Sequence, residues 1–373
     1  MVAANNDGLV GCLRVIKDPR IDRTKRHPLV SVLFIGICSV LCGAESWEQM
    51  EDFGYSRKEW LGQYVELPHG IPSHDTFGRV FAQIDSKAFQ ESFLSWVKLV
   101  TLKMPGQIIS IDGKTLRRSH DRVKGKKALH LVSAWVSANH LVLGQIKTED
   151  KSNEITAIPE LLNLLDLCGS IVTVDAMGTQ KEIAKHIQDK KADYVMALKG
   201  NQGLLHEEVK TFWEDPKLSE SEYQSHETVD KGHGRFEIRR YKISDQIGWL
   251  EPKQEWKGLR TIGVVESERT IGEQKTVERR YYISTLKPDA REFARAVREH
   301  WGIENQLHWS LDVSFREDQC RVRIQRAAEN FALLRRMALH MLKQDKTTNK
   351  SLNRKRWLAA MDTDYLRLIL GGV

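Results

Sequence analysis

Ile108-Ile109-Ser110-Ile111-Asp112-Gly113-Lys114 is the stretch from which the fold can be worked out. Its β-branched residues favour a short buried strand, and Asp112 falls where that strand ends. A second run of the same kind, Ile171-Val172-Thr173-Val174-Asp175, also ends in a carboxylate. A single aspartate at a strand end is commonly only a turn former or a helix cap. Two of them on neighbouring strands instead indicate a metal or acid–base site.

The pattern around these two runs is that of a mixed sheet with helices. We expect strands at 107–112, 129–137, 141–146, 171–175 and 194–198, with helices opening near Ser152 and covering 180–190. A helical crossover makes the strand at 171–175 parallel to the first, so both aspartates reach one edge of the sheet. The order β-β-β-α-β-α-β with these carboxylates predicts an α/β, RNase H-like catalytic core built on a mixed five-stranded sheet. Its chemistry is the metal-dependent cutting or joining of nucleic acid.

This fold needs a third carboxylate on a later helix. Residues 204–288 contain β-rich segments at 237–243, 259–268 and 277–284 and predict an inserted β subdomain, whereas helical periodicity returns at 289–311. On that helix Glu304 is our candidate, with His300 and His308 one turn away on either side. We expect the two histidines to contact phosphate or to orient Glu304.

The three carboxylates predict a two-metal site. Asp112 and Asp175 would share one divalent ion, and Asp112 and Glu304 would hold a second, as in the two-metal displacement at phosphorus. Mg²⁺ is the expected ion because a hard cation prefers carboxylate oxygen, and Mn²⁺ can substitute.

Alternatives for this helix remain open. Asp312 and Asp318 are rival third carboxylates. The histidines could form a zinc stripe, although their spacing is not the His-Glu-x-x-His of metalloproteases. Trp301 and Trp309 could stack on an unpaired base, but we favour core packing for both.

Composition places the chain among folded, basic proteins. Of its 373 residues 41% are hydrophobic, and the formal net charge of +7 suits a polyanionic partner such as nucleic acid. The segment Lys114–Lys127 holds seven Lys or Arg residues against the single acid Asp121, and it is either a DNA contact or a solvated loop. Cysteine usage and hydropathy indicate the compartment. The odd count of five cysteines, with no CxxC pair, suits a reducing compartment. The longest apolar run, Leu29–Ala44, is too short for an ordinary membrane span, so we expect a buried helix in a cytoplasmic protein without a membrane partner.

Five parts follow along the chain: a helical N-terminal domain (1–104), the first part of the core (105–203), the β-rich insertion (204–288), C-terminal core helices (289–343) and a basic tail (344–373). The N-terminal domain either binds DNA ends or braces the core. The tail either contacts the DNA backbone or is simply solvated.

The chain also resembles a known family in five motifs. These are Ile-Asp-Gly-Lys at 111–114, Val-Asp-Ala at 174–176, Leu-Lys-Gly-Asn-Gln at 198–202, the segment from His300 to Phe315, and Gly70 to Phe77 near the N-terminus. Together they resemble the ISAs-type insertion-sequence transposases, which include the H-repeat-associated proteins. The resemblance runs over nearly the whole chain.

That resemblance implies a DDE transposase whose two aspartates and glutamate are Asp112, Asp175 and Glu304. It also implies Mg²⁺, DNA as partner, a homodimer on paired element ends, and a place in the bacterial cytoplasm with the nucleoid. We therefore predict DNA cleavage at insertion-sequence ends and strand transfer to target DNA. The alternatives are a metal-dependent DNA endonuclease without strand transfer, or a DNA-binding remnant that has lost catalysis. The predicted DNA contacts are Lys114, Arg117, Arg118, Lys124, Lys126, Lys199, Asn201, His233, Arg235, Arg298, His300 and His308.

Overall fold

The computed structural model describes residues 8–100, 106–120, 128–138, 140–148, 154–232 and 235–371. The predicted contacts Lys124, Lys126 and His233 lie outside these residues. Within them, no helix combines the length and the apolar character needed to cross a membrane.

Helices form the N-terminal end of the molecule. They are α1 (Leu9–Arg14), α2 (Leu29–Leu41), α3 (Trp47–Ser56), α4 (Lys58–Leu61), α5 (His74–Gln83) and α6 (Ser86–Val100). The predicted buried helix is confirmed as α2, in which twelve of the thirteen residues are buried. Ser73 caps α5 by accepting a hydrogen bond from the Thr76 amide, because the first amides of a helix lack partners within it.

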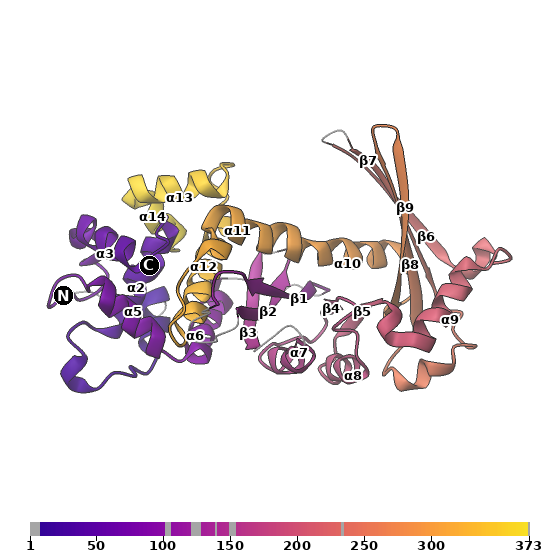
Figure 1. Ribbon diagram of the computed structural model, residues 1–373, viewed down its shortest axis with the longest axis horizontal. Coiled ribbons are helices and arrows are strands. Elements are labelled where there is room, and N and C mark those ends of the chain that lie inside the picture. The colour runs from indigo at the N-terminus through magenta and orange to yellow at the C-terminus, as the bar shows by residue number, and fades with distance from the viewer. Residues whose placement is uncertain are drawn as a thin grey trace.

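The C-terminal residues form two helices beside this N-terminal end. They are α13 (Leu352–Met361) and α14 (Thr363–Ile369), and they lie against α2 and the long helix α12 (Ala327–Gln344) (Figure 1). Lys355 and Arg356 are buried, and Arg356 donates to the Val40 carbonyl of α2 at 3.2 Å. The prediction of a DNA-binding or solvated tail is therefore wrong for these two residues, whose charged groups bond to partners inside the protein.

A single mixed sheet runs through the rest of the molecule. In the described residues it has nine strands in the order β3-β2-β1-β4-β5-β9-β8-β7-β6. The predicted core strands are confirmed as β1 (Ile108–Leu116), β2 (Leu129–Val136), β3 (Leu141–Thr148), β4 (Ile171–Val174) and β5 (Asp193–Leu198). The first three are antiparallel, and β4 is parallel to β1, as the helical crossover predicted.

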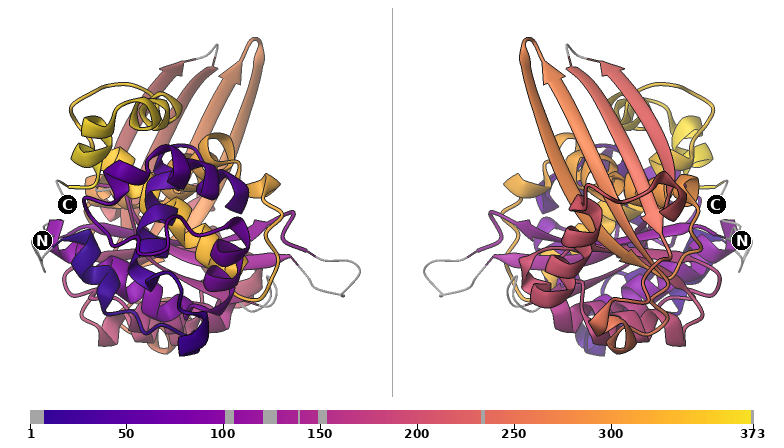
Figure 2. Two further views of the ribbon diagram at one scale, coloured as in Figure 1. Left: turned by 90° about the vertical axis from the view of Figure 1, so that its left-hand side faces the viewer. Right: turned by 90° about the vertical axis from the view of Figure 1, so that its right-hand side faces the viewer.

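The predicted β insertion continues this sheet instead of forming a separate layer. Its strands are β6 (Gln224–Gly232), β7 (Arg235–Ser244), β8 (Thr261–Ile271) and β9 (Gln274–Ser284), preceded by α9 (Gly203–Glu214). β9 pairs antiparallel with β5, so the expected five-stranded sheet is corrected to nine. Figure 2 shows the four long strands rising beyond the rest of the molecule.

Helices cover both faces of the sheet. α10 (Ala290–Gly302) contacts β1, β4 and β5 on one face, while α7 (Glu154–Asn163) and α8 (Lys181–Asp189) pack against the other (Figure 1). α10 continues through a π-helical turn (Ile303–His308) into α11 (Trp309–Phe315). The buried helix α12 (Ala327–Gln344) joins the sheet to the N-terminal helices.

Candidate active site

Three carboxylates come from three elements that meet at one edge of the sheet. Asp175 follows the last residue of β4, and Glu304 lies in the π-helical turn. The prediction that the first strand ends at Asp112 is wrong: Asp112 lies within β1, which continues to Leu116 because it stays paired with β2. The parallel register places Ile111 opposite Val174, so the next residue on each strand is one of the two aspartates. π-helical turns are rare and are found disproportionately at functional sites, because the extra residue re-aims side chains.

The electrostatics of Asp112 indicate that the other two carboxylates lie near enough to act on it. Burial raises the pKa of Asp112 to about 7, and the charges of Asp175 and Glu304 contribute to the rise. Asp175 and Glu304 also line one cavity of about 320 Å³, whose wall includes Lys199 and Arg280. Carboxylates are therefore gathered in this region, and a bound cation would favour the ionised form of Asp112 by offsetting their repulsion.

The fit to a divalent metal ion rests on the donor set. The three groups offer only carboxylate oxygen, which suits a hard ion such as Mg²⁺. Among the described residues, however, no group of three or more His, Cys, Asp or Glu side chains is gathered closely enough to hold one ion. The donor chemistry and the nearness of the carboxylates fit a divalent ion, although the ligands are not gathered around one point.

The two histidines beside Glu304 face different strands. The Nδ1 atom of His300 lies 2.9 Å from the Thr173 hydroxyl of β4, and that of His308 lies 3.5 Å from an Asp112 carboxylate oxygen. Burial lowers the pKa of His300 to about 4 and that of His308 to about 3, so both are neutral at pH 7. They are placed to position strand residues, and they carry no positive charge for a phosphate.

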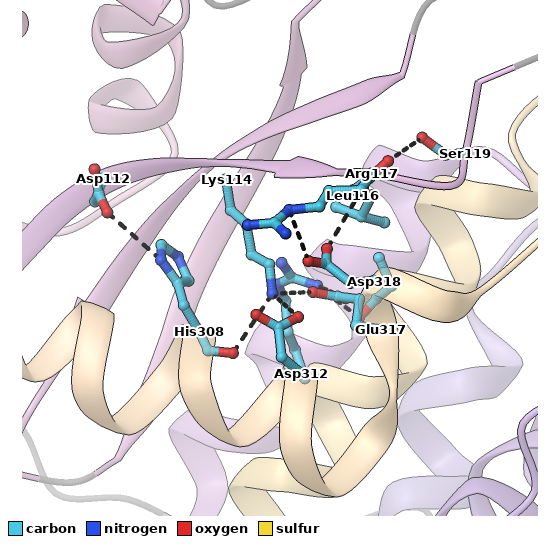
Figure 3. A network of polar contacts seen from close by, with 11 residues as sticks. Asp112, Lys114, Leu116, Arg117, Ser119, His308, Asp312, Glu317 and Asp318 are labelled. Atoms are coloured by element: carbon cyan, nitrogen blue, oxygen red, sulfur yellow. Dashed lines mark hydrogen bonds and ion pairs between the residues drawn. The ribbon is translucent and has the colours of Figure 1, made fainter.

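Lys114 is a correction to the predicted DNA contacts. Its side chain is buried and forms ion pairs with Asp312 and, at 3.4 Å, with Glu317 (Figure 3). Asp312 is therefore occupied by Lys114, and the other rival carboxylate, Asp318, pairs with Arg117 at 3.2 Å.

The other predicted DNA contacts differ in whether their side chains are exposed or already bound to another part of the protein. Arg117, Arg118 and Lys199 are exposed. Asn201 donates its side-chain amide to the Ala176 carbonyl at 2.7 Å, and the exposed Arg298 pairs with Asp230 at 3.3 Å. The remaining described candidate, Arg235, begins β7.

Some features of the site were missed from the sequence. A buried pair, His130 and Glu154, lies 2.6 Å apart behind Gly113, where a β-carbon would collide with both side chains. This close approach explains glycine next to Asp112, but the pairing of distant residues leaves no local signal in the sequence.

The two tryptophans also differ from expectation. Core packing is wrong for Trp309, whose side chain is 59% exposed. Trp301 is half-buried under the guanidinium group of Arg280, which lies 4.5 Å from the ring centroid. The indoles therefore lie at the surface of the helix that carries Glu304.

Comparison with known proteins gives the family of this chain. Residues 103–341 match the family described as "Transposase DDE domain", and residues 10–97 match the associated family DDE_Tnp_1-associated. The chain belongs to the DDE transposase family.

Relatives of this DDE-family chain are similar to it over nearly their whole lengths. The chain is 45% identical to "Putative transposase YncI" of Escherichia coli O157:H7, over 97% of this chain and 94% of that protein. It is 44% identical to "H repeat-associated putative transposase YhhI" of Escherichia coli K12, over 96% of this chain and 97% of that protein. A solved structure of the piggyBac transposase synaptic complex with hairpin DNA is similar with a TM-score of 0.45 and 12% identity, covering 98% of this chain and 78% of that one. The resemblance to insertion-sequence transposases that the motifs indicated is confirmed.

Proposed function

We propose that this DDE-family protein is an active transposase with an RNase H-like core, which cleaves DNA at insertion-sequence ends and transfers the strands to target DNA. The observation that carries the proposal is the meeting of Asp112, Asp175 and Glu304 at one sheet edge, where the charges of the other two help to raise the pKa of Asp112. The sheet order β3-β2-β1-β4-β5, with β1 to β3 antiparallel and β4 and β5 parallel, supports the RNase H-like assignment.

Each carboxylate has a distinct place in this proposal. Asp112 is the central ligand because it is coupled to both other groups, while Asp175 and Glu304 hold the two sides of the site. These carboxylates would hold Mg²⁺ or Mn²⁺, which would supply Lewis-acid activation of the attacking oxygen and stabilisation of the leaving oxygen. In this proposal Lys199 and Arg280, on the wall of the cavity that Asp175 and Glu304 line, would bind the phosphates of the substrate strand, with Arg280 exchanging its ion pair with Glu278 for a phosphate.

The exposed cations near β1 define the proposed DNA surface. Arg117 and Arg118 follow the strand that carries Asp112, and both residues are exposed, although Arg117 also pairs with Asp318. Replacing both with glutamine should weaken DNA binding and reduce its salt slope by about one for each phosphate that is no longer bound. Lys217, an exposed lysine in the loop after α9, is the matched control, and its replacement with glutamine should leave the slope unchanged. An unaltered slope in the double variant would remove this surface from the DNA interface.

Cleavage with Mg²⁺ or Mn²⁺ on DNA carrying the element's own ends tests the chemistry. Asp112→Ala and Glu304→Gln should each abolish cutting while DNA binding is kept. Asp318→Asn is the matched control, because its carboxylate pairs with Arg117 and lies in the segment that follows α11. Loss of cutting in Asp318→Asn, with cutting retained in Glu304→Gln, would show that the third carboxylate was wrongly assigned.

Strand transfer separates the proposal from its alternatives. The wild type should join pre-cleaved ends with free 3′-hydroxyls to a target plasmid, and the length of the product reports the joining. Metal-dependent cutting without joining would identify an endonuclease. DNA binding with no cutting on any substrate would identify a catalytically silent protein.

The family also suggests how the protein assembles. We propose that it acts as a homodimer that holds paired element ends in one complex. Its mass in solution when bound to DNA carrying one end, measured by light scattering, should correspond to two chains and two DNA molecules. A complex of one chain with one DNA molecule that still joins ends to target DNA would contradict this.

A further inference from the structure

A buried lysine connects β1 to the helical segment that carries Glu304. Lys114 is 8% exposed and lies two residues after Asp112, on the same face of the strand. Its Nζ atom donates to the main-chain carbonyl of His308 at 3.4 Å and forms ion pairs with Asp312 and Glu317 (Figure 3). All three partners come from residues 308–317, directly after Glu304.

The far side of this connection is also anchored. Glu317 is fully buried and pairs at 2.8 Å with Arg336 of α12, which is also fully buried. Lys114 therefore joins β1 to a segment that is itself fixed to the central helix α12. A buried ammonium needs such partners, because an unpaired charge in the interior is strongly unfavourable.

The segment that Lys114 holds contains the π-helical turn. Glu304 is the second residue of that turn and His308 is the last. A π-helical turn is rare and appears mostly as a single turn inside an α-helix, so it depends on its surroundings to persist. Since a helix is stiff along its axis, fixing His308 and Asp312 against β1 also fixes the place of Glu304 relative to Asp112.

We propose that Lys114 is a positioning residue, which sets the place of Glu304 relative to Asp112 by holding residues 308–317 against β1. The proposal rests on the transposase function proposed above for the three carboxylates. Lys114 acts through the helical segment, and its buried ammonium does not contact DNA.

A matched lysine elsewhere in the chain separates positioning from general stability. Lys355 is also buried, pairs with Asp345 at 3.2 Å, and donates to the carbonyls of Leu342 and Asp345 at 3.2 and 2.7 Å. It lies in α13, among helices at the N-terminal end of the molecule (Figure 1). Lys114→Met and Lys355→Met therefore remove the same kind of buried cation from two different places.

Two measurements on the full chain test the proposal. Hydrogen–deuterium exchange should rise over residues 303–315 in Lys114→Met, and over residues 342–361 in Lys355→Met. Single-turnover cleavage of pre-bound DNA, per folded molecule, should fall about 10- to 100-fold in Lys114→Met, as for other residues that orient metal ligands. DNA affinity should be unchanged in Lys114→Met, and Lys355→Met should cleave at the wild-type rate.

Other outcomes overturn the proposal. Wild-type exchange over residues 303–308 in Lys114→Met would show that the lysine does not hold the turn, and an unchanged rate would show that it does not position Glu304. If Lys114→Met does not fold, Asp312→Asn replaces it, because that half-exposed carboxylate can lose its charge without a cavity. Asp312→Asn should raise exchange over the same residues, and no rise would overturn the proposal. If the wild type cuts no DNA, the transposase function fails, whereas the exchange measurement still decides whether Lys114 holds the turn.

Discussion

The buried ion pair between Arg336 and Glu317 gives a quantitative prediction. Both side chains are fully buried, and Arg336 Nη1 donates to a Glu317 carboxylate oxygen at 2.8 Å and to the Ala332 carbonyl at 3.0 Å. The Nε and Nη2 atoms of Arg336 have no hydrogen-bond acceptor among the described residues. The pair is thus strongly coupled but incompletely satisfied.

This arrangement predicts opposite results for a single and a double change. Arg336→Met leaves the Glu317 carboxylate buried with Lys114, at 3.4 Å, as its remaining ion-pair partner, and should lower the free energy of unfolding by about 3–5 kcal/mol. Adding Glu317→Leu removes the charge that was left behind. The double variant should therefore recover most of that stability, because replacing a whole buried pair with apolar groups is often neutral or stabilising.

Urea unfolding followed by far-ultraviolet circular dichroism at pH 7 measures these differences. The wild type, both single variants and the double variant form a complete cycle, which isolates the coupling between the two side chains. A double variant no more stable than Arg336→Met would contradict the prediction. It would mean that the stability comes from packing of the arginine stem and not from the balance of buried charge.

Three further predictions concern other parts of the structure. Gly113→Ala places a β-carbon 2.6 Å from His130 Nε2 and should lower stability by about 1–3 kcal/mol in thermal unfolding, whereas Gly200→Ala, where a β-carbon meets nothing within 4 Å, should not. Burial alone would raise the pKa of Glu317, but the buried cations around it outweigh that effect and lower the pKa from 4.5 to about 2. The stability that the ionised carboxylate contributes should therefore be complete above pH 4.5 and lost as the pH falls toward 2, as acid titration of the folded fraction would measure. Trp309→Ala should change stability by no more than about 0.5 kcal/mol because the indole is exposed, so a large fall in the unfolding midpoint would show that it is packed.

The strands of the core and the residues most suited to chemistry could be predicted from the sequence. Runs of β-branched residues are local signals that made β1 and β4 predictable, and the short apolar run from Tyr194 to Leu198 made β5 predictable. The helical crossover made β4 parallel to β1. The same local pattern correctly placed Asp175 directly after β4, but not Asp112 at a strand end, because pairing with β2 carries β1 on to Leu116. β6 was missed because it is a polar, exposed edge strand whose sequence shows little alternation of apolar and polar residues.

Long-range packing decided which charged and aromatic side chains are buried, paired or exposed. Lys114 looks like the start of a basic loop in the sequence, but carboxylates about 200 residues later make it a buried structural cation. Arg356 looks like part of a solvated tail, but it is buried and donates a hydrogen bond to the Val40 carbonyl of α2, from the other end of the chain. Trp309 looks like core but is left exposed because no element packs over that side of its helix in the described part of the chain. One cause is common to all of them: burial and charge pairing depend on residues distant in the chain, whereas strand and helix formation depend mainly on near neighbours.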